Sequence, residues 1–167
     1  MLVRWNRLSA KEAAEEISPC CGAVAWAREL VERRPFADES SLIAASEEIW
    51  FRLNADDWME AFSKHPRIGE RKAPEAASTK SASWSAQEQQ NVAAGRAALQ
   101  LALTNGNREY EEKFGRVFIV CATGRSASEI LEILHRRLQN DAATELREAA
   151  QEQNKITNLR LKKWLAT

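Results

Sequence analysis

The chain has 167 residues, a length that fits one domain and can bury an apolar core without help from a metal or a disulfide. Its 24 basic and 24 acidic residues balance, which argues against the broad positive field of proteins that bind nucleic acid or anionic lipid. We therefore expect no nucleic-acid partner and no membrane partner, and any anion binding should be local.

The cysteine pattern bears on the compartment. Cys20, Cys21 and Cys121 are odd in number and two are adjacent, a poor basis for a disulfide framework and typical of a reducing compartment. The sequence has no basic segment followed by an apolar run at its start, and no stretch approaches about 18 apolar residues. We expect a cytoplasmic protein without a targeting or membrane-spanning segment.

Helix-start signals begin near the N-terminus. Ser9 and Glu12 have the spacing of a capping box, which predicts a helix over about residues 10–16. Ser18 followed by Pro19 predicts the start of a second, core-facing helix, because proline is favoured at the first helical position.

Two further helices are expected before the middle of the chain. The third starts at Asp38 or Ser41, and the fourth starts at Asn54, because short polar side chains favour helix N-caps. Apolar residues then recur at helical spacing in both segments. The fourth helix ends just before His65.

The second half also contains helix starts. Ser85 and Glu88 form another capping box, and the long helix that follows is expected to end at Asn105-Gly106. Asn107 is expected to cap a brief helix after this break.

An apolar, β-branched run at Val117–Cys121 has no candidate partner strand. We expect either an extended segment that crosses the core or the start of a helix whose local strand preference is overridden. Ser126 with Glu129 caps a further helix, and a last helix runs to the C-terminus. The sum is an all-α fold of about eight helices in one domain, residues 1–167, without an internal repeat.

One of the two histidines, His65, stands directly before Pro66. Imidazole has a pKa near neutral pH and can pass a proton in either direction, and the proline places it on a stiffened bend. His65 fits equally well as an ordinary helix C-terminal residue stabilised by the helix dipole. The loop that follows, about 70–84, is long for a connection and is expected to be mobile.

The first turn of the helix after Ser85 carries a carboxylate and an amide, Glu88 and Gln89. A helix start suits anions, although Glu88 taken alone more simply closes the capping box. No cluster of His, Cys, Asp and Glu has metal-ligand spacing, so we expect no metal site.

Several separated motifs together carry a family resemblance. In chain order they are Asn6-Arg7-Leu8-Ser9 with Ser18-Pro19, His65-Pro66-Arg67-Ile68-Gly69, Ser85-x-x-Glu88-Gln89, Lys113-Phe114-Gly115 with Phe118-Ile119-Val120-Cys121-Ala122, and Lys155-Ile156-x-x-Leu159-Arg160-Leu161. Nearly the whole chain thus resembles the family of 2-oxo-4-hydroxy-4-carboxy-5-ureidoimidazoline decarboxylases, which act late in urate breakdown.

The resemblance implies a cofactor-free lyase that removes CO2 from the ureidoimidazoline and leaves (S)-allantoin, and it implies a homodimer. The family's catalytic positions match His65 and Glu88 in this sequence. Its substrate-binding positions match Pro66, Ser85, Gln89, the main chain at Val120, and Arg160.

The decarboxylation itself requires groups of these kinds, independently of the resemblance. Loss of CO2 leaves an electron pair that can flow toward the adjacent ring imine, so neither metal nor thiamine is required. His65 can protonate one face of the new carbon, and Arg160 can hold a carboxylate or a ureido carbonyl through its planar fork. Glu88 could orient His65, hold the substrate hydroxyl or accept its proton. The alternative function is a noncatalytic helical module that binds a purine-derived or ureido ligand without turnover.

Overall fold

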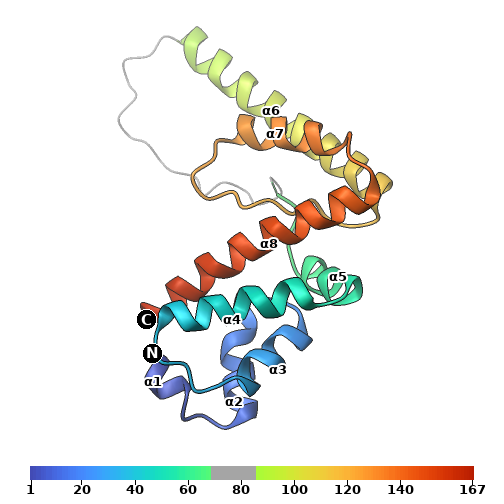
Figure 1. Cartoon of the computed structure of the whole chain (residues 1–167). Helices are drawn as coiled ribbons and strands as arrows, with labels where there is room; N and C mark the ends of the chain where they lie inside the picture. Colours follow the sequence, from blue (N-terminus) through green and yellow to red (C-terminus); the bar gives the residue numbers. More distant parts are fainter. Residues whose placement is uncertain (69–85) are drawn as a thin grey trace. The chain divides into compact units, whose positions relative to one another are not determined.

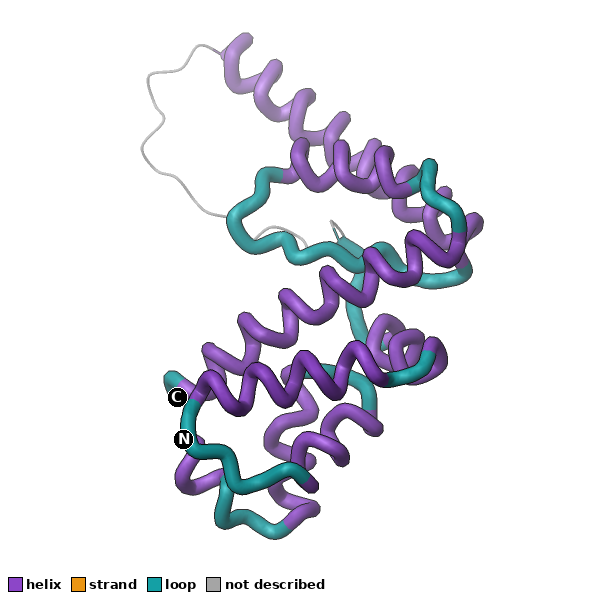
Figure 2. The backbone as a smooth tube through the Cα atoms, in the orientation of Figure 1, coloured by secondary structure: helices purple, strands orange, loops and turns teal. Residues whose placement is uncertain are grey.

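The computed structural model describes residues 1–68 and 86–167, and it describes side chains for residues 1–68 and 95–167. These residues form α-helices and one 3-10 turn, with no strand in the described ranges (Figure 2). The helices are α1 (Leu2–Trp5), α2 (Ala10–Ile17), α3 (Val24–Glu32), α4 (Glu39–Arg52), α5 (Ala55–Ser63), α6 (Ala86–Phe114), α7 (Ala127–Arg137) and α8 (Ala142–Leu165), and the 3-10 turn η1 (Ser18–Cys20) follows α2. The all-α prediction is confirmed.

The chain divides into two compact units. The first unit consists of Met1–His65, Ile119–Cys121 and Asp141–Thr167, and the second consists of Pro66–Phe118 and Ala122–Asn140. The single domain over 1–167 stays a prediction. The loop expected at about 70–84, and Ser85 with it, lie outside the described residues.

In the first unit, α8 packs against α4, α5 and η1, and α4 and α8 lie side by side (Figure 1). Trp5, Trp26 and Trp50 fill its interior, each at most 1% exposed. Trp26 Nε1 donates to Ser46 Oγ at 3.2 Å, and Trp50 Nε1 donates to the Ala150 carbonyl at 2.8 Å. The tryptophans therefore bury large apolar areas while their polar N–H groups stay satisfied.

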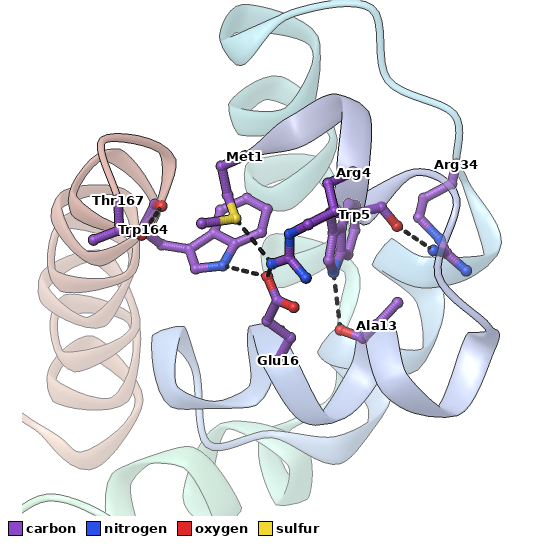
Figure 3. A network of polar contacts seen from close by, with 8 residues as sticks. All are labelled: Met1, Arg4, Trp5, Ala13, Glu16, Arg34, Trp164 and Thr167. Atoms are coloured by element: carbon purple, nitrogen blue, oxygen red, sulfur yellow. Dashed lines mark hydrogen bonds and ion pairs between the residues drawn. The ribbon is translucent and has the colours of Figure 1, made fainter.

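The short helix α1 is fastened to α2 and α8 by polar contacts (Figure 3). The carboxylate of Glu16 on α2 accepts hydrogen bonds from Arg4 of α1 and, at 3.1 Å, from Trp164 Nε1 of α8. Trp5 Nε1 donates to the Ala13 carbonyl at 3.0 Å. Because these bonds join segments near both ends of the chain, they hold α8 against the N-terminal helices.

The second unit pairs α6 with α7. Arg137 of α7 is fully buried, and its guanidinium lies 4.7 Å from the centre of the Phe118 ring and 6.0 Å from that of Tyr110. Such cation–π contacts stabilise a buried guanidinium. Lys113 Nζ donates to the Leu138 carbonyl at 2.6 Å, at the C-terminal end of α7. This contact satisfies a carbonyl that the helix leaves unpaired.

Most predicted helix starts are confirmed. Ser9 and Ser126 each close a capping box, and Asn54 Oδ1 accepts two backbone N–H bonds at the start of α5. Of the two alternatives for α4, Asp38 is the N-cap and Ser41 completes its box. These signals depend on neighbours two or three residues apart, so local sequence is sufficient to place them.

The predicted helix start at Ser18 is wrong. Ser18 Oγ donates to the Glu15 carbonyl at 3.0 Å, so it closes the end of α2 instead of capping a new helix. Pro19 lies in the 3-10 turn, the backbone becomes extended at Cys21, and α3 begins at Val24. The N-cap of α3 has no side-chain acceptor of its own, and Glu60 of α5 accepts the Val24 N–H at 2.9 Å instead.

The predicted break at Asn105-Gly106, with a new helix at Asn107, is also wrong, because α6 continues through these residues. A Cβ on Gly106 would lie 2.6 Å from Leu134 Cδ2, so glycine serves there for the close approach of α7. The helix ends instead before Gly115, which has φ +67°, the left-handed conformation that favours glycine.

The apolar run at Val117–Cys121 is not helical, which removes the helix alternative. Phe118, Ile119, Val120 and Cys121 are all buried. The short segment Ile119–Cys121 belongs to the first unit, and its position there matters for the site described below.

Candidate active site

His65 follows the C-terminal end of α5, as the sequence predicted. Lys64 is the C-cap of this helix, and the His65 backbone N–H donates to the Phe62 carbonyl at 3.1 Å. The side chain is half-buried, and Pro66, which comes next, is exposed and belongs to the second unit. The backbone at His65 is therefore fixed by the helix end.

Burial is the main cause that lowers the pKa of His65 below 6.5, because the charged imidazolium loses hydration. The positive charge of Arg160 lowers this pKa further, and a side-chain interaction with Gln153 opposes the shift. The net effect keeps the imidazole of His65 neutral at neutral pH, which is the form that accepts a proton.

One face of α8 carries polar residues toward this histidine. Gln153, Thr157 and Arg160 are spaced four and three residues apart, so they lie along the same side of the helix. Gln153 Nε2 donates to Thr157 Oγ1 at 3.2 Å. Arg160 is half-buried, and its Nη1 donates to the Pro19 carbonyl at 3.3 Å. No carboxylate among the described residues pairs with Arg160, so its guanidinium can donate hydrogen bonds to an anion or a carbonyl.

The backbone around Val120 is held on α8 by Glu152. The Cys121 N–H donates to Glu152 Oε2 at 2.8 Å, and Lys155 Nζ contacts Glu152 Oε1 at 2.6 Å. Glu152 is only 6% exposed. Because Glu152 precedes Gln153 in α8, the main chain at Val120 lies on the helix that carries the polar face.

The adjacent cysteines are buried free thiols beside the same helix. Burial raises the pKa of Cys20 and of Cys21 to about 11, although the charge of Arg160 acts in the opposite direction. Both groups are therefore protonated at neutral pH, so neither is a thiolate nucleophile.

His65, Arg160 and the Val120 segment belong to the first unit, and the charge of Arg160 acts on His65. Of the other predicted site residues, Glu88 and Gln89 lie in α6, but their side chains are outside the described residues. Their roles, like those of Ser85 and Pro66, stay predictions. Within the described ranges, no three His, Cys, Asp or Glu side chains are grouped as metal ligands. None of the described helices is long and apolar enough to cross a membrane.

Sequence reasoning missed three residues of this region, Glu152, Gln153 and Thr157. A signal was present, because all three are polar side chains that interrupt the buried face of a long helix near Arg160. Buried polar residues on a core-facing stripe are uncommon and need partners.

An imidazole with a lowered pKa and a nearby guanidinium are groups that can carry out acid–base chemistry on a substrate that bears a carboxylate or a carbonyl. The particular family follows from comparison with known proteins. The chain belongs to the OHCU decarboxylase family, whose family model matches residues 6–162.

Relatives of known name agree with this membership. The uric acid degradation bifunctional protein TTL of Arabidopsis thaliana is 38% identical over 151 residues, which cover 89% of this chain and 46% of that protein. The chain thus spans less than half the length of this relative. The 2-oxo-4-hydroxy-4-carboxy-5-ureidoimidazoline decarboxylase of Amia calva is 31% identical over 162 residues, covering 93% of this chain and 89% of that protein.

A solved structure is similar in fold. The crystal structure of an OHCU decarboxylase in the presence of (S)-allantoin matches with a TM-score of 0.72 and 36% identity, covering 92% of this chain and 99% of that chain.

Proposed function

We propose that this chain is a carboxy-lyase that converts 2-oxo-4-hydroxy-4-carboxy-5-ureidoimidazoline to (S)-allantoin and CO2 in urate breakdown, without a cofactor. The observation that carries the proposal is the neutral imidazole of His65 close to Arg160 in the first unit. Family membership over residues 6–162 supports the substrate class.

In the proposed reaction, Arg160 holds the substrate carboxylate or its ureido carbonyl through paired N–H donors. The bond between the ring carbon and the carboxylate breaks, CO2 leaves, and the electron pair flows toward the adjacent ring imine, whose nitrogen takes up one proton. The hydroxyl then gives up its proton to become a carbonyl, and the ureido-bearing carbon receives a proton on one face. A neutral His65 can accept the first of these last two protons and supply the second.

The remaining predicted residues complete the proposed site. Glu88 is the second proposed acid–base group, and the proposed substrate contacts are Pro66, Ser85, Gln89 and the main chain at Val120. The bond between Cys121 N–H and Glu152 supports the last of these, because it fixes the main chain next to Val120.

The test is the rate at which (S)-allantoin appears from freshly generated substrate, followed by circular dichroism. The wild-type protein should exceed the rate in buffer, and His65→Asn should lose about 100-fold or more of the acceleration, in line with the usual contribution of a general acid–base group. His135→Asn is the matched control, because His135 is an exposed surface histidine in α7. It should keep full activity.

Two outcomes would overturn parts of the proposal. Saturable binding of substrate with no acceleration would favour the noncatalytic binding module. Wild-type activity in His65→Asn would remove the acid–base role of His65 while leaving the reaction in place.

We also propose that the protein works as a cytoplasmic homodimer. The family resemblance and the three free cysteines support this assignment. Sedimentation equilibrium should give twice the 18.8 kDa mass of the chain, and a monomer at micromolar concentration would contradict it.

A further inference from the structure

A chain of polar side chains runs through the buried part of the first unit and ends at His65. Gln153 is fully buried and Thr157 is 2% exposed. Gln153 acts on the imidazole of His65 at one end and raises its pKa, and Thr157 acts on the thiol of Cys21 at the other end and lowers its pKa. The groups lie in the order Cys21, Thr157, Gln153, His65.

The hydrogen bonds of this chain fix the orientation of the Gln153 amide. A hydroxyl can accept one hydrogen bond while it donates another, so Thr157 accepts from Gln153 Nε2 at 3.2 Å while its own hydrogen is free to turn toward Cys21. One N–H of the Gln153 amide is bonded to Thr157, and of the groups that remain only the amide oxygen can accept a hydrogen from the imidazole.

Gln153 Oε1 is buried and has no fully formed hydrogen bond to any described residue. A buried acceptor without a donor costs about 1–3 kcal/mol, so a donor from the His65 ring would stabilise the site by satisfying this oxygen. The Gln153 interaction favours the protonated imidazole, which is the effect expected of an acceptor that faces a ring N–H.

We propose that Gln153 is a positioning residue for His65: its Oε1 accepts the hydrogen of one ring nitrogen and leaves the other ring nitrogen unprotonated toward the substrate. A histidine that must act as a base needs a defined tautomer, and the partner of the second nitrogen sets it. The inference rests on the proposed decarboxylation and adds a residue that acts through His65 without touching the substrate.

Charged and titratable groups on the neighbouring helices affect the pKa values of His65 and of the two cysteines. Arg160 of α8 opposes protonation of His65, and Glu60 of α5 acts on Cys21. The thiols of Cys20 and Cys21 carry no charge at neutral pH, because burial raises the pKa of each to about 11. Among the residues whose side chains the structure describes, Arg160 is therefore the ionised group that acts on the titration of His65.

The first experiment is 15N NMR of the wild-type protein labelled at histidine, with His135→Asn used to assign the two imidazoles. At pH 7.5, His65 should show one protonated and one unprotonated ring nitrogen with well-separated shifts. Gln153→Met, similar in shape but without the amide, should bring the two shifts together as both tautomers become populated. Gln153→Glu should raise the pKa of His65 by about one unit or more, because a carboxylate favours the imidazolium.

The matched control is Asn154→Ala. Asn154 is a buried amide in the same helix that donates to Glu47 Oε1 at 3.0 Å, away from the chain that ends at His65. This variant should keep the wild-type imidazole shifts. Thr157→Val, which frees the Gln153 amide to turn, should reproduce the tautomer mixture and serves as the second variant if Gln153→Met does not fold.

Kinetics give an independent measurement. Gln153→Met should lower kcat by about 10-fold or more with little change in KM, since the tautomer competent as a base becomes a minor form. Wild-type imidazole shifts and wild-type kcat in a folded Gln153→Met would overturn the inference. If the wild-type protein shows no decarboxylation, the proposed function fails, whereas the NMR shifts still decide the role of Gln153.

Discussion

The hydrogen bond between Cys121 N–H and Glu152 gives the prediction that follows most directly from the structure. The donor belongs to a segment without regular structure, and the acceptor is a carboxylate that is 6% exposed on α8. Glu152→Ala removes this acceptor, so the buried N–H of Cys121 loses its hydrogen bond to the carboxylate. The change should loosen the Val120 main chain, which we propose contacts the substrate.

The magnitude follows from the burial of the two groups. A hydrogen bond to a charged group contributes about 1.5–3 kcal/mol, so Glu152→Ala should lower the free energy of unfolding by about 3 kcal/mol. Glu152→Gln keeps an acceptor and should lower it by about 1 kcal/mol. Lys155, which forms an ion pair with Glu152, has a side chain that is 55% exposed. Lys155→Ala should therefore change the free energy of unfolding by about 0.5 kcal/mol or less.

Urea unfolding followed by circular dichroism measures this order of stabilities. The KM for substrate should rise in Glu152→Ala and stay near the wild-type value in Lys155→Ala. A free energy of unfolding for Glu152→Ala within about 0.5 kcal/mol of wild type would refute the reasoning. Equal losses in the Lys155 and Glu152 variants would contradict the stabilising role assigned to the bond with Cys121.

Three further predictions concern close packing, titration and thiol reactivity. Gly106→Ala should lower the free energy of unfolding by about 1 kcal/mol, because the new Cβ would lie 2.6 Å from Leu134 Cδ2. In a Leu134→Ala background that contact is gone, so the better helix propensity of alanine should raise the free energy of unfolding. The same sign of the effect in both backgrounds would contradict this reasoning. Since burial lowers the pKa of His65 below its unfolded value of 6.5, stability should fall as pH drops through 6.5, and His65→Asn should remove that part of the pH dependence. Cys20 and Cys21, each with a pKa of about 11, should react with a thiol reagent at pH 7 only on unfolding, and rapid labelling of the native protein would contradict their burial.

Local chemistry explains which parts of the fold were predictable. The caps at Ser9, Asn54 and Ser126 are confirmed because each acts on backbone groups two or three residues away. The prediction at Ser18 failed because its hydroxyl is used by the preceding helix. The prediction at Gly106 failed because glycine there permits the approach of α7, a tertiary reason that local sequence does not show.

The residues of the site also fall into two groups: those that sequence motifs predict and those that only the packing reveals. His65 and Arg160 were predicted from family motifs, and the structure adds why His65 is neutral. Gln153 and Thr157 were missed because no motif marks them, and their polarity matters only once the helix face is known to be buried. Buried polar pairs of this kind are recognised from packing, not from spacing alone.

The measurement that tests the central claim most directly is the chirality of allantoin formed from freshly generated substrate. Protonation in water can take place on either face of the ring carbon, whereas a fixed acid–base group delivers the proton to one face. The account predicts (S)-allantoin in large excess with the wild-type protein, and a racemic product formed at the buffer rate with His65→Asn. Racemic allantoin at the buffer rate with the wild-type protein would contradict the proposed function.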